Sequence, residues 1–124
     1  MSSLNRPHED VPLVALAQIE DGALVEVETV VAGAPESVLV HRDGGAARAW
    51  LNVCPHAGRR LDWAPGRFLR SREGLLVCAA HGASFELAGG ECVAGPCRGE
   101  ALRAVAVVVR DGQVLLCADG DAGR

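Results

Sequence analysis

Two short segments of the chain each carry one cysteine and one histidine, residue types whose thiolate and imidazole groups bind transition metals. One segment reads Cys54-x-His56 and the other Cys78-x-x-His81. The stretch between them, residues 57–77, is long enough for the chain to turn back on itself. We therefore expect the two segments to face each other and form one site, which could bind zinc or an iron–sulfur cluster.

The spacing of the ligands separates these two options. Structural zinc sites usually pair ligands two to four residues apart, whereas only one residue lies between Cys54 and His56. Ligands this close suit two loops that grip a binuclear cluster from opposite sides. A zinc site stays open as the alternative.

The two motifs together resemble those of the Rieske family. Gly58 follows His56 by two residues and Gly82 follows His81 by one, and residues 90–97 are similar to the proline-containing cover loop of that family. The resemblance implies one 2Fe-2S cluster, in which two thiolates hold one iron and two imidazoles hold the other. The ligands implied are Cys54, His56, Cys78 and His81.

The pattern of apolar residues independently predicts an all-β fold. Val25 and Val27 alternate with Glu26 and Glu28, which is the period of a half-buried strand, and the Asp-Gly pairs at 43–44 and 111–112 are hairpin signals. We expect about nine short strands, a turn at 33–36, one strand over 101–109 and no helix. The strands over 47–53 and 74–77 would lead directly to Cys54 and Cys78.

The Rieske resemblance adds detail to this fold. It implies an antiparallel β-sandwich or partly open barrel, in which a small cluster-binding subdomain, about residues 52–97, is inserted between strands of a larger base. The length of 124 residues predicts that residues 1–124 form one domain.

Composition limits the classes of function. The chain has 12 basic residues, all arginine, and 16 acidic ones, which argues against binding nucleic acid through its phosphates. Residues 1–10 contain no apolar run and no apolar stretch is long enough to span a bilayer, so we expect a cytoplasmic protein without membrane contact. Five cysteines in such a protein suit metal binding better than disulfides.

Departures from the family pattern indicate the branch. High-potential members join the two ligand loops by a disulfide at the positions of Arg59 and Ala80, and donate hydrogen bonds to sulfur from a serine and a tyrosine at the positions of Ala83 and Phe85. Such hydrogen bonds stabilise the reduced cluster, so their absence lowers the potential. The chain therefore resembles the low-potential, ferredoxin-type branch.

This resemblance implies an electron carrier rather than an enzyme. A Rieske oxygenase also needs a mononuclear iron held by two histidines and a carboxylate, yet no histidine follows His81, and no glycine-rich dinucleotide motif occurs. We expect a ferredoxin that passes single electrons from a reductase to a terminal oxygenase. The alternatives are a small Rieske-like subunit of a larger reductase, such as nitrite reductase, and a zinc-binding or redox-sensing module.

Several further residues carry expectations. We expect five arginines near the first motif to form a positive docking patch for an acidic redox partner: Arg59, Arg60, Arg67, Arg70 and Arg72. We expect Cys92 and Cys97 to pack under the cover loop, His41 to be a surface imidazole, and Trp50 and Trp63 to lie in the core or at its rim.

Overall fold

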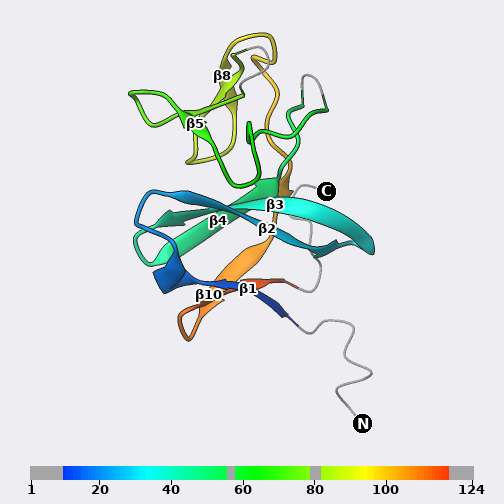
Figure 1. The fold of residues 1–124 in the computed structure, drawn as a ribbon, viewed down its shortest axis with the longest axis vertical. Coiled ribbons are helices and arrows are strands. Elements are labelled where there is room, and N and C mark those ends of the chain that lie inside the picture. The colour runs from blue at the N-terminus through cyan, green and yellow to red at the C-terminus, as the bar shows by residue number, and fades with distance from the viewer. Residues whose placement is uncertain (1–9, 56–57, 79–81, 118–124) are drawn as a thin grey trace.

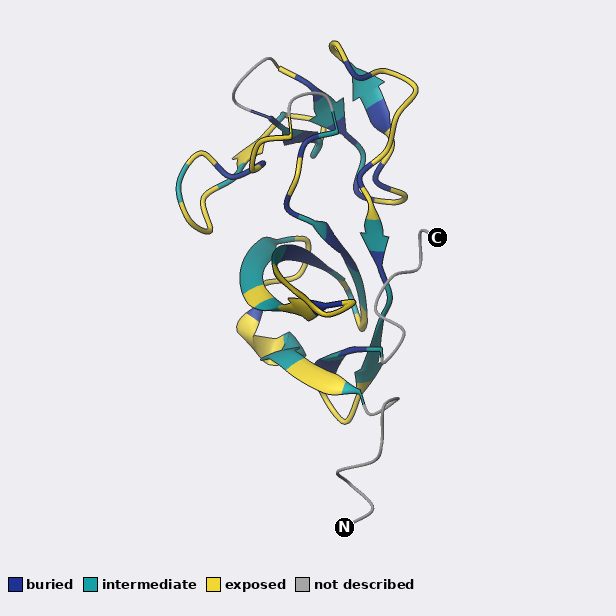
Figure 2. Cartoon of the chain, turned by 90° about the vertical axis from the view of Figure 1, so that its right-hand side faces the viewer, coloured by how far each residue is buried: buried dark blue, intermediate teal, exposed yellow. Residues whose placement is uncertain are grey.

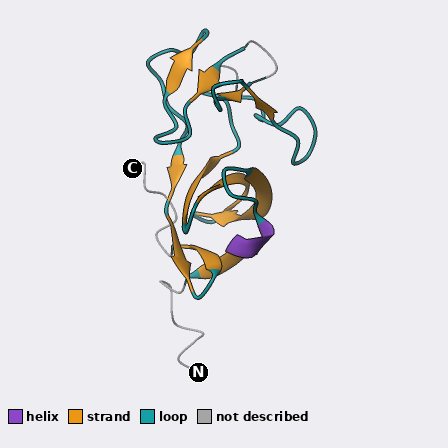
Figure 3. Ribbon diagram, turned by 90° about the vertical axis from the view of Figure 1, so that its left-hand side faces the viewer, coloured by secondary structure: helices purple, strands orange, loops and turns teal. Residues whose placement is uncertain are grey.

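The fold is all-β, as the alternation of apolar residues predicts. A computed structural model describes residues 10–55, 58–78 and 82–117, and within these ranges every sheet is antiparallel. The described chain contains no α-helix; its one helical element is a single turn of 3-10 helix, Leu16–Gln18 (Figure 3). No helix among the described residues is long and apolar enough to cross a membrane.

In the described part of the chain, eleven strands form three sheets. The first sheet has the order β1 (Val11–Ala15), β11 (Gln113–Leu116), β10 (Val107–Arg110). The second has the order β2 (Leu24–Val31), β3 (Ala34–Asp43), β4 (Ala46–Leu51), β9 (Ala104–Val105). The third has the order β5 (Leu69–Arg70), β6 (Leu76–Val77), β7 (Ser84–Phe85), β8 (Cys92–Ala94). Figure 1 shows the second sheet between the other two.

The first and second sheets form a base that is open on one side. The strand expected over 101–109 is in fact two strands, β9 and β10, which are separated by Ala106 and pair in different sheets. The chain therefore passes from one sheet to the other at Ala106, which joins the two sheets along one edge. This is the sandwich or partly open barrel that the sequence analysis expects, and the barrel is not closed.

Strands β3 and β4 bury both of their faces. Val38, Val40 and Ala49 pack toward the first sheet, in an apolar core that also contains Val114 and Leu116. The alternate residues Leu39 and Trp50, which pair across the two strands, belong to a second core that extends into the third sheet. In Figure 2, buried residues lie in this central layer and in the sheets on either side of it. Ala49 and Trp50, which are adjacent in β4, therefore belong to two different cores.

Three two-residue turns set the register of the base. Asp111 and Gly112 make the turn expected from their Asp-Gly pair, and both have positive φ, as a type I′ hairpin requires. The turn expected at 43–44 is made instead by Gly44 and Gly45, because Asp43 pairs with Ala46. The turn expected at 33–36 is displaced: Ala32 and Gly33 make it, with φ of 52° and 87°, and Pro35 pairs with Val30 in β3. Proline is tolerated there because β4 pairs only with the part of β3 from Val38 onward.

The third sheet lies in the long connection between β4 and β9. Its strands have only two or three residues each, so a short strand such as β5 leaves no alternating pattern in the sequence and was not predicted. Its apolar residues instead join the second core, where Leu76 and Phe85 are fully buried. This packing fixes the third sheet against the outer face of the base.

Candidate metal centre

The two Cys-His segments form loops that are closed in the same way. The N–H of Cys54 donates to the carbonyl of Arg59 at 2.7 Å, and the N–H of Gly58 donates back to the carbonyl of Cys54 at 2.8 Å. The second loop repeats both bonds, from Cys78 to Ala83 at 2.7 Å and from Gly82 to Cys78 at 2.9 Å. Gly58 and Gly82 both have positive φ, at 68° and 76°. The described ends of the two segments are therefore closed by equivalent pairs of hydrogen bonds, although the spacing of the histidines differs.

The two expected thiolate ligands share one environment. Cys54 and Cys78 are each 1 % exposed, and both belong to the apolar core beneath the third sheet. Burial among apolar side chains keeps water away from the two sulfurs, and such an apolar shell controls solvent access to a metal site. Two buried thiols at equivalent positions on paired loops are the donor chemistry that an iron–sulfur cluster requires.

The two expected imidazole ligands, His56 and His81, lie outside the described residues, as does Ala80. In the sequence, each histidine falls between the cysteine and the glycine whose hydrogen bond closes its loop. The four-residue ligand set stays a prediction from the sequence.

A third loop packs directly on the second ligand loop. Gly95 has a φ of 93°, and a Cβ built on it would stand 2.8 Å from the Cα of Ala83 and 3.0 Å from the carbonyl of Gly82. Any side chain at position 95 would therefore push the two loops apart. This contact lies in the 90–97 segment that resembles a cover loop, and the glycine beside Pro96 is the sequence signal that could have revealed it.

Cys92 and Cys97 pack beneath this cover loop, as expected. Both are buried free thiols of the same apolar core. Burial, reinforced by a hydrogen bond with Cys92, raises the pKa of Cys97 to about 12. Cys97 is therefore a neutral packing group next to the site.

A polar network anchors the first ligand loop to the base. Asn52, which is 1 % exposed, accepts a hydrogen bond from the N–H of Leu61 at 2.7 Å and donates to the hydroxyl of Ser37 at 3.1 Å. That hydroxyl donates to Glu26 at 2.7 Å. The network thus links both ends of the segment that contains the loop to β2 and β3. Sequence analysis did not identify Asn52, because its partners are distant in the chain.

Arg60 belongs to this anchor. Its guanidinium donates two hydrogen bonds to Asp62, at 2.8 and 2.9 Å, and lies 3.4 Å from Glu26. Burial opposes ionisation of Asp62, but the bonds from Arg60 and from the N–H of Gly66 outweigh it and lower the pKa of that carboxyl. The charge of Arg60 is thus balanced by two carboxylates, and the expectation that Arg60 steers a partner stays a prediction.

His41 also differs from expectation. It is 8 % exposed rather than at the surface, and its Nδ1 has no hydrogen-bond partner among the described residues. Burial and the nearby Arg70 and Arg48 lower the pKa of His41, against the opposing effect of Asp43. His41 is therefore a neutral imidazole between the second sheet and Arg70.

Comparison with known proteins identifies the family. The sequence profile described as "Rieske [2Fe-2S] domain" matches residues 9–117, which include both loops and the cover loop. The chain belongs to the Rieske [2Fe-2S] domain family. A search of curated protein sequences gave no significant match.

Solved structures with a similar fold include ferredoxin and oxygenase components of carbazole 1,9a-dioxygenase. The ferredoxin of carbazole 1,9a-dioxygenase from Nocardioides aromaticivorans IC177 is 30% identical, with a TM-score of 0.66 over 87% of this Rieske chain and 96% of its own. A complex of reduced oxygenase and oxidized ferredoxin in carbazole 1,9a-dioxygenase matches at 22% identity and a TM-score of 0.68, over 90% and 95% of the two chains.

The terminal oxygenase from the same Nocardioides strain matches at 23% identity and a TM-score of 0.67, over 89% of this chain but only 30% of the oxygenase chain. The Rieske chain described here therefore corresponds in extent to the ferredoxin. It corresponds to only a minor part of the oxygenase chain.

Proposed function

We propose that this Rieske protein is a ferredoxin that carries single electrons from a reductase to a terminal oxygenase. The observation that carries the proposal is the pair of equivalent loops, which presents two buried thiols, Cys54 and Cys78, at matching positions. The similarity in both sequence and extent to a ferredoxin of an oxygenase system supports this role.

We assign four ligands to one 2Fe-2S cluster, within a cluster-binding portion of about residues 52–97. Cys54 and Cys78 would hold one iron, and His56 and His81 the other. When bound, the cluster supplies a centre that accepts and releases one electron. The chain's own residues hold the two sulfurs out of water and fix the loops through Asn52 and Gly95.

We place the potential at the low end of the Rieske range, at about −150 mV. Ala83 and Phe85, which stand where high-potential members donate hydrogen bonds to sulfur, are fully buried and have no side-chain donor. The site would therefore be less able to stabilise the extra negative charge of reduction.

We also propose that the carrier works in the cytoplasm. None of the five cysteines, all of which lie in the described residues, forms a disulfide, which suits a reducing compartment. The redox partners would then be soluble proteins, a reductase on one side and an oxygenase component on the other.

Anaerobic reconstitution with iron and sulfide tests the ligand set. The wild-type protein should bind two irons per chain, turn reddish brown, and give on reduction a rhombic paramagnetic resonance signal with an average g below the free-electron value. His56→Ala and His81→Ala should each abolish that signal. The matched control is His8→Ala, which removes a histidine outside both motifs and should leave the signal unchanged.

Two outcomes would refute the assignment. A colourless protein that binds one zinc ion per chain would establish the zinc alternative. An intact signal in His81→Ala would show that another residue is the ligand.

A further inference from the structure

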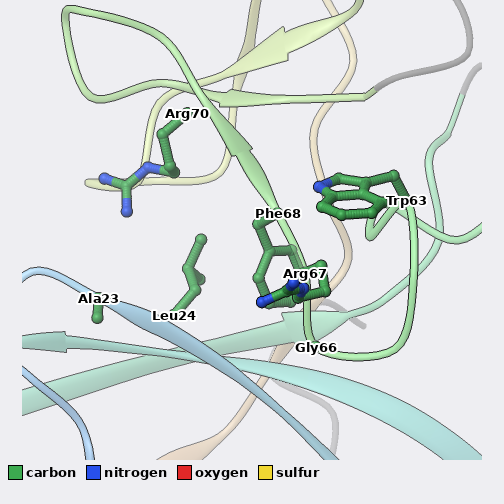
Figure 4. Close-up of a pocket in the computed structure, with 7 residues that line it drawn as sticks. All are labelled: Ala23, Leu24, Trp63, Gly66, Arg67, Phe68 and Arg70. Carbon is green, nitrogen blue, oxygen red and sulfur yellow. The ribbon is translucent and has the colours of Figure 1, made fainter.

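An open cavity lies on the flank of the molecule, where the third sheet meets the base. It has a volume of about 500 Å3 and is formed by the start of β2 and the segment that leads into β5. Six residues line most of it: Ala23, Leu24, Trp63, Arg67, Phe68 and Arg70. Figure 4 shows the indole of Trp63 at one end of the cavity and Arg70 at the other, with Arg67 and Phe68 between them in this view.

Trp63 is exposed to an extent that packing does not explain. It is 55 % exposed, whereas the other tryptophan, Trp50, is 2 % exposed in the core. The guanidinium of Arg67 lies over its ring at 5.4 Å from the centroid, and the neighbouring Leu69 is 43 % exposed. Tryptophan and arginine are the residues most enriched among those that dominate binding energy at protein interfaces.

The charge of the cavity is positive and unbalanced. In the described part of the chain, neither Arg67 nor Arg70 forms an ion pair with a carboxylate, and no acidic residue lines the cavity. Arg70 instead donates to the carbonyls of Gly22 and Gly74, which holds its guanidinium at the cavity edge. By contrast, Arg48, Arg60 and Arg110 are each paired with an acid. An uncompensated positive site on a chain of net charge −4 is complementary to an acidic partner.

We propose that this cavity, formed by Trp63, Arg67 and Arg70, is a second docking point for the electron-accepting oxygenase component, and that it takes an acidic surface segment with one apolar side chain. The proposal rests on the proposed carrier function. If the oxygenase component contacted only the ligand loops, the carrier could still rotate about that single contact. A second contact on the flank would fix the rotation and so select productive encounters.

The test uses the reconstituted holoprotein and the terminal oxygenase from Nocardioides aromaticivorans IC177 as acceptor. Stopped-flow mixing of reduced carrier with oxidised oxygenase gives the second-order transfer rate. We expect Arg67→Gln to lower this rate about two- to fivefold and Trp63→Ala to lower it at least about fivefold, with midpoint potentials and paramagnetic signals unchanged. Arg110→Gln, which removes the same charge from β10 in the first sheet, is the matched control and should transfer at the wild-type rate.

A second measurement makes the docking point testable without electron transfer. A fluorescein-labelled peptide of glutamate, aspartate and one leucine should bind the wild-type holoprotein saturably, and bind Trp63→Ala and Arg67→Gln several-fold more weakly. The same peptide with lysine in place of its acids should not bind.

The outcomes separate the two proposals. If wild-type transfer is observed and both cavity variants match it, the docking point is overturned while the carrier function stands. If no transfer to this oxygenase occurs, the carrier proposal fails for this acceptor. The peptide assay then tests the cavity by itself: if the peptide does not bind saturably, or binds both variants as tightly as the wild type, the docking point is overturned.

Discussion

Gly95 and Ala83 approach each other so closely that a Cβ on Gly95 would stand 2.8 Å from the Cα of Ala83. This distance is shorter than carbon atoms tolerate without displacement. The contact joins the cover loop to the loop that carries Cys78, so the position of one loop depends on the other.

Gly95→Ala should therefore destabilise the protein and weaken retention of the cluster. The added methyl group meets backbone atoms, which cannot rotate away, and we expect a loss of about 2–4 kcal/mol in unfolding free energy. Gly99→Ala is the matched control, because Gly99 has a φ of 95° but nothing within 4 Å of its Cβ position. Denaturant unfolding of both variants should show the larger loss for Gly95→Ala; equal losses would mean that backbone strain alone is responsible.

Arg60→Gln should lower stability, whereas Arg59→Gln should not. Loss of the Arg60 guanidinium leaves the carboxylate of Asp62, whose side chain is 1 % exposed, without a charged partner. We expect a loss of about 1–3 kcal/mol for Arg60→Gln and less than about 0.5 kcal/mol for the exposed Arg59. Chemical denaturation at neutral pH measures both, and an unchanged midpoint for Arg60→Gln would contradict the anchoring role.

Stability should fall on mild acidification because of His41. Its pKa is lowered in the folded protein, so below the ordinary value of 6.5 the unfolded chain binds a proton that the folded chain does not. The contribution of neutral His41 is complete above that pH and is lost as the pH falls below it, at no more than about 1.4 kcal/mol per pH unit. His41→Gln should reduce the difference in unfolding free energy between pH 7.5 and pH 5.5, and an identical difference in the variant would rule out His41 as the cause.

Ala83→Ser should raise the midpoint potential. A hydroxyl at this position could donate to sulfur, and a bond stronger by about 1.4 kcal/mol in the reduced state corresponds to roughly 60 mV. Ala83→Gly adds no donor and serves as the control in a redox titration followed by visible absorbance. A wild-type potential well above zero would contradict the role assigned to Ala83 and Phe85.

Local patterns in the sequence predicted the base well. The alternation of Val25 and Val27 with Glu26 and Glu28 predicts strand β2 from strand geometry alone, and the Asp-Gly pair at 111–112 determines its turn through backbone sterics. These features depend on neighbours in the chain. The equivalence of the two ligand loops is likewise visible in the sequence as a glycine four residues after each cysteine.

Features that depend on distant residues were missed or misjudged. His41 is buried because Arg70 and the backbone of Gly22 lie against it, and Arg60 is neutralised in part by Glu26 on β2. Strand β5 exists only through its pairing with β6. No local pattern marks such contacts, since each is formed by tertiary packing.

Because both faces of β3 are buried in apolar cores, the contrast between a buried and a solvent-exposed face does not fix its pairing register. In most antiparallel sheets a register shift of one residue moves apolar side chains into water, which makes the shifted pairing unstable. In β3 the same shift would only move Leu39 into the core that now holds Val38 and Val40, and move these valines into the core that now holds Leu39. Discrimination against the slipped pairing must then come from side-chain volume, from the short turns at 32–33 and 44–45, and from the hydrogen bond between Asn52 and Ser37. Lengthening either turn by one residue should consequently yield alternative pairings that coexist in one preparation.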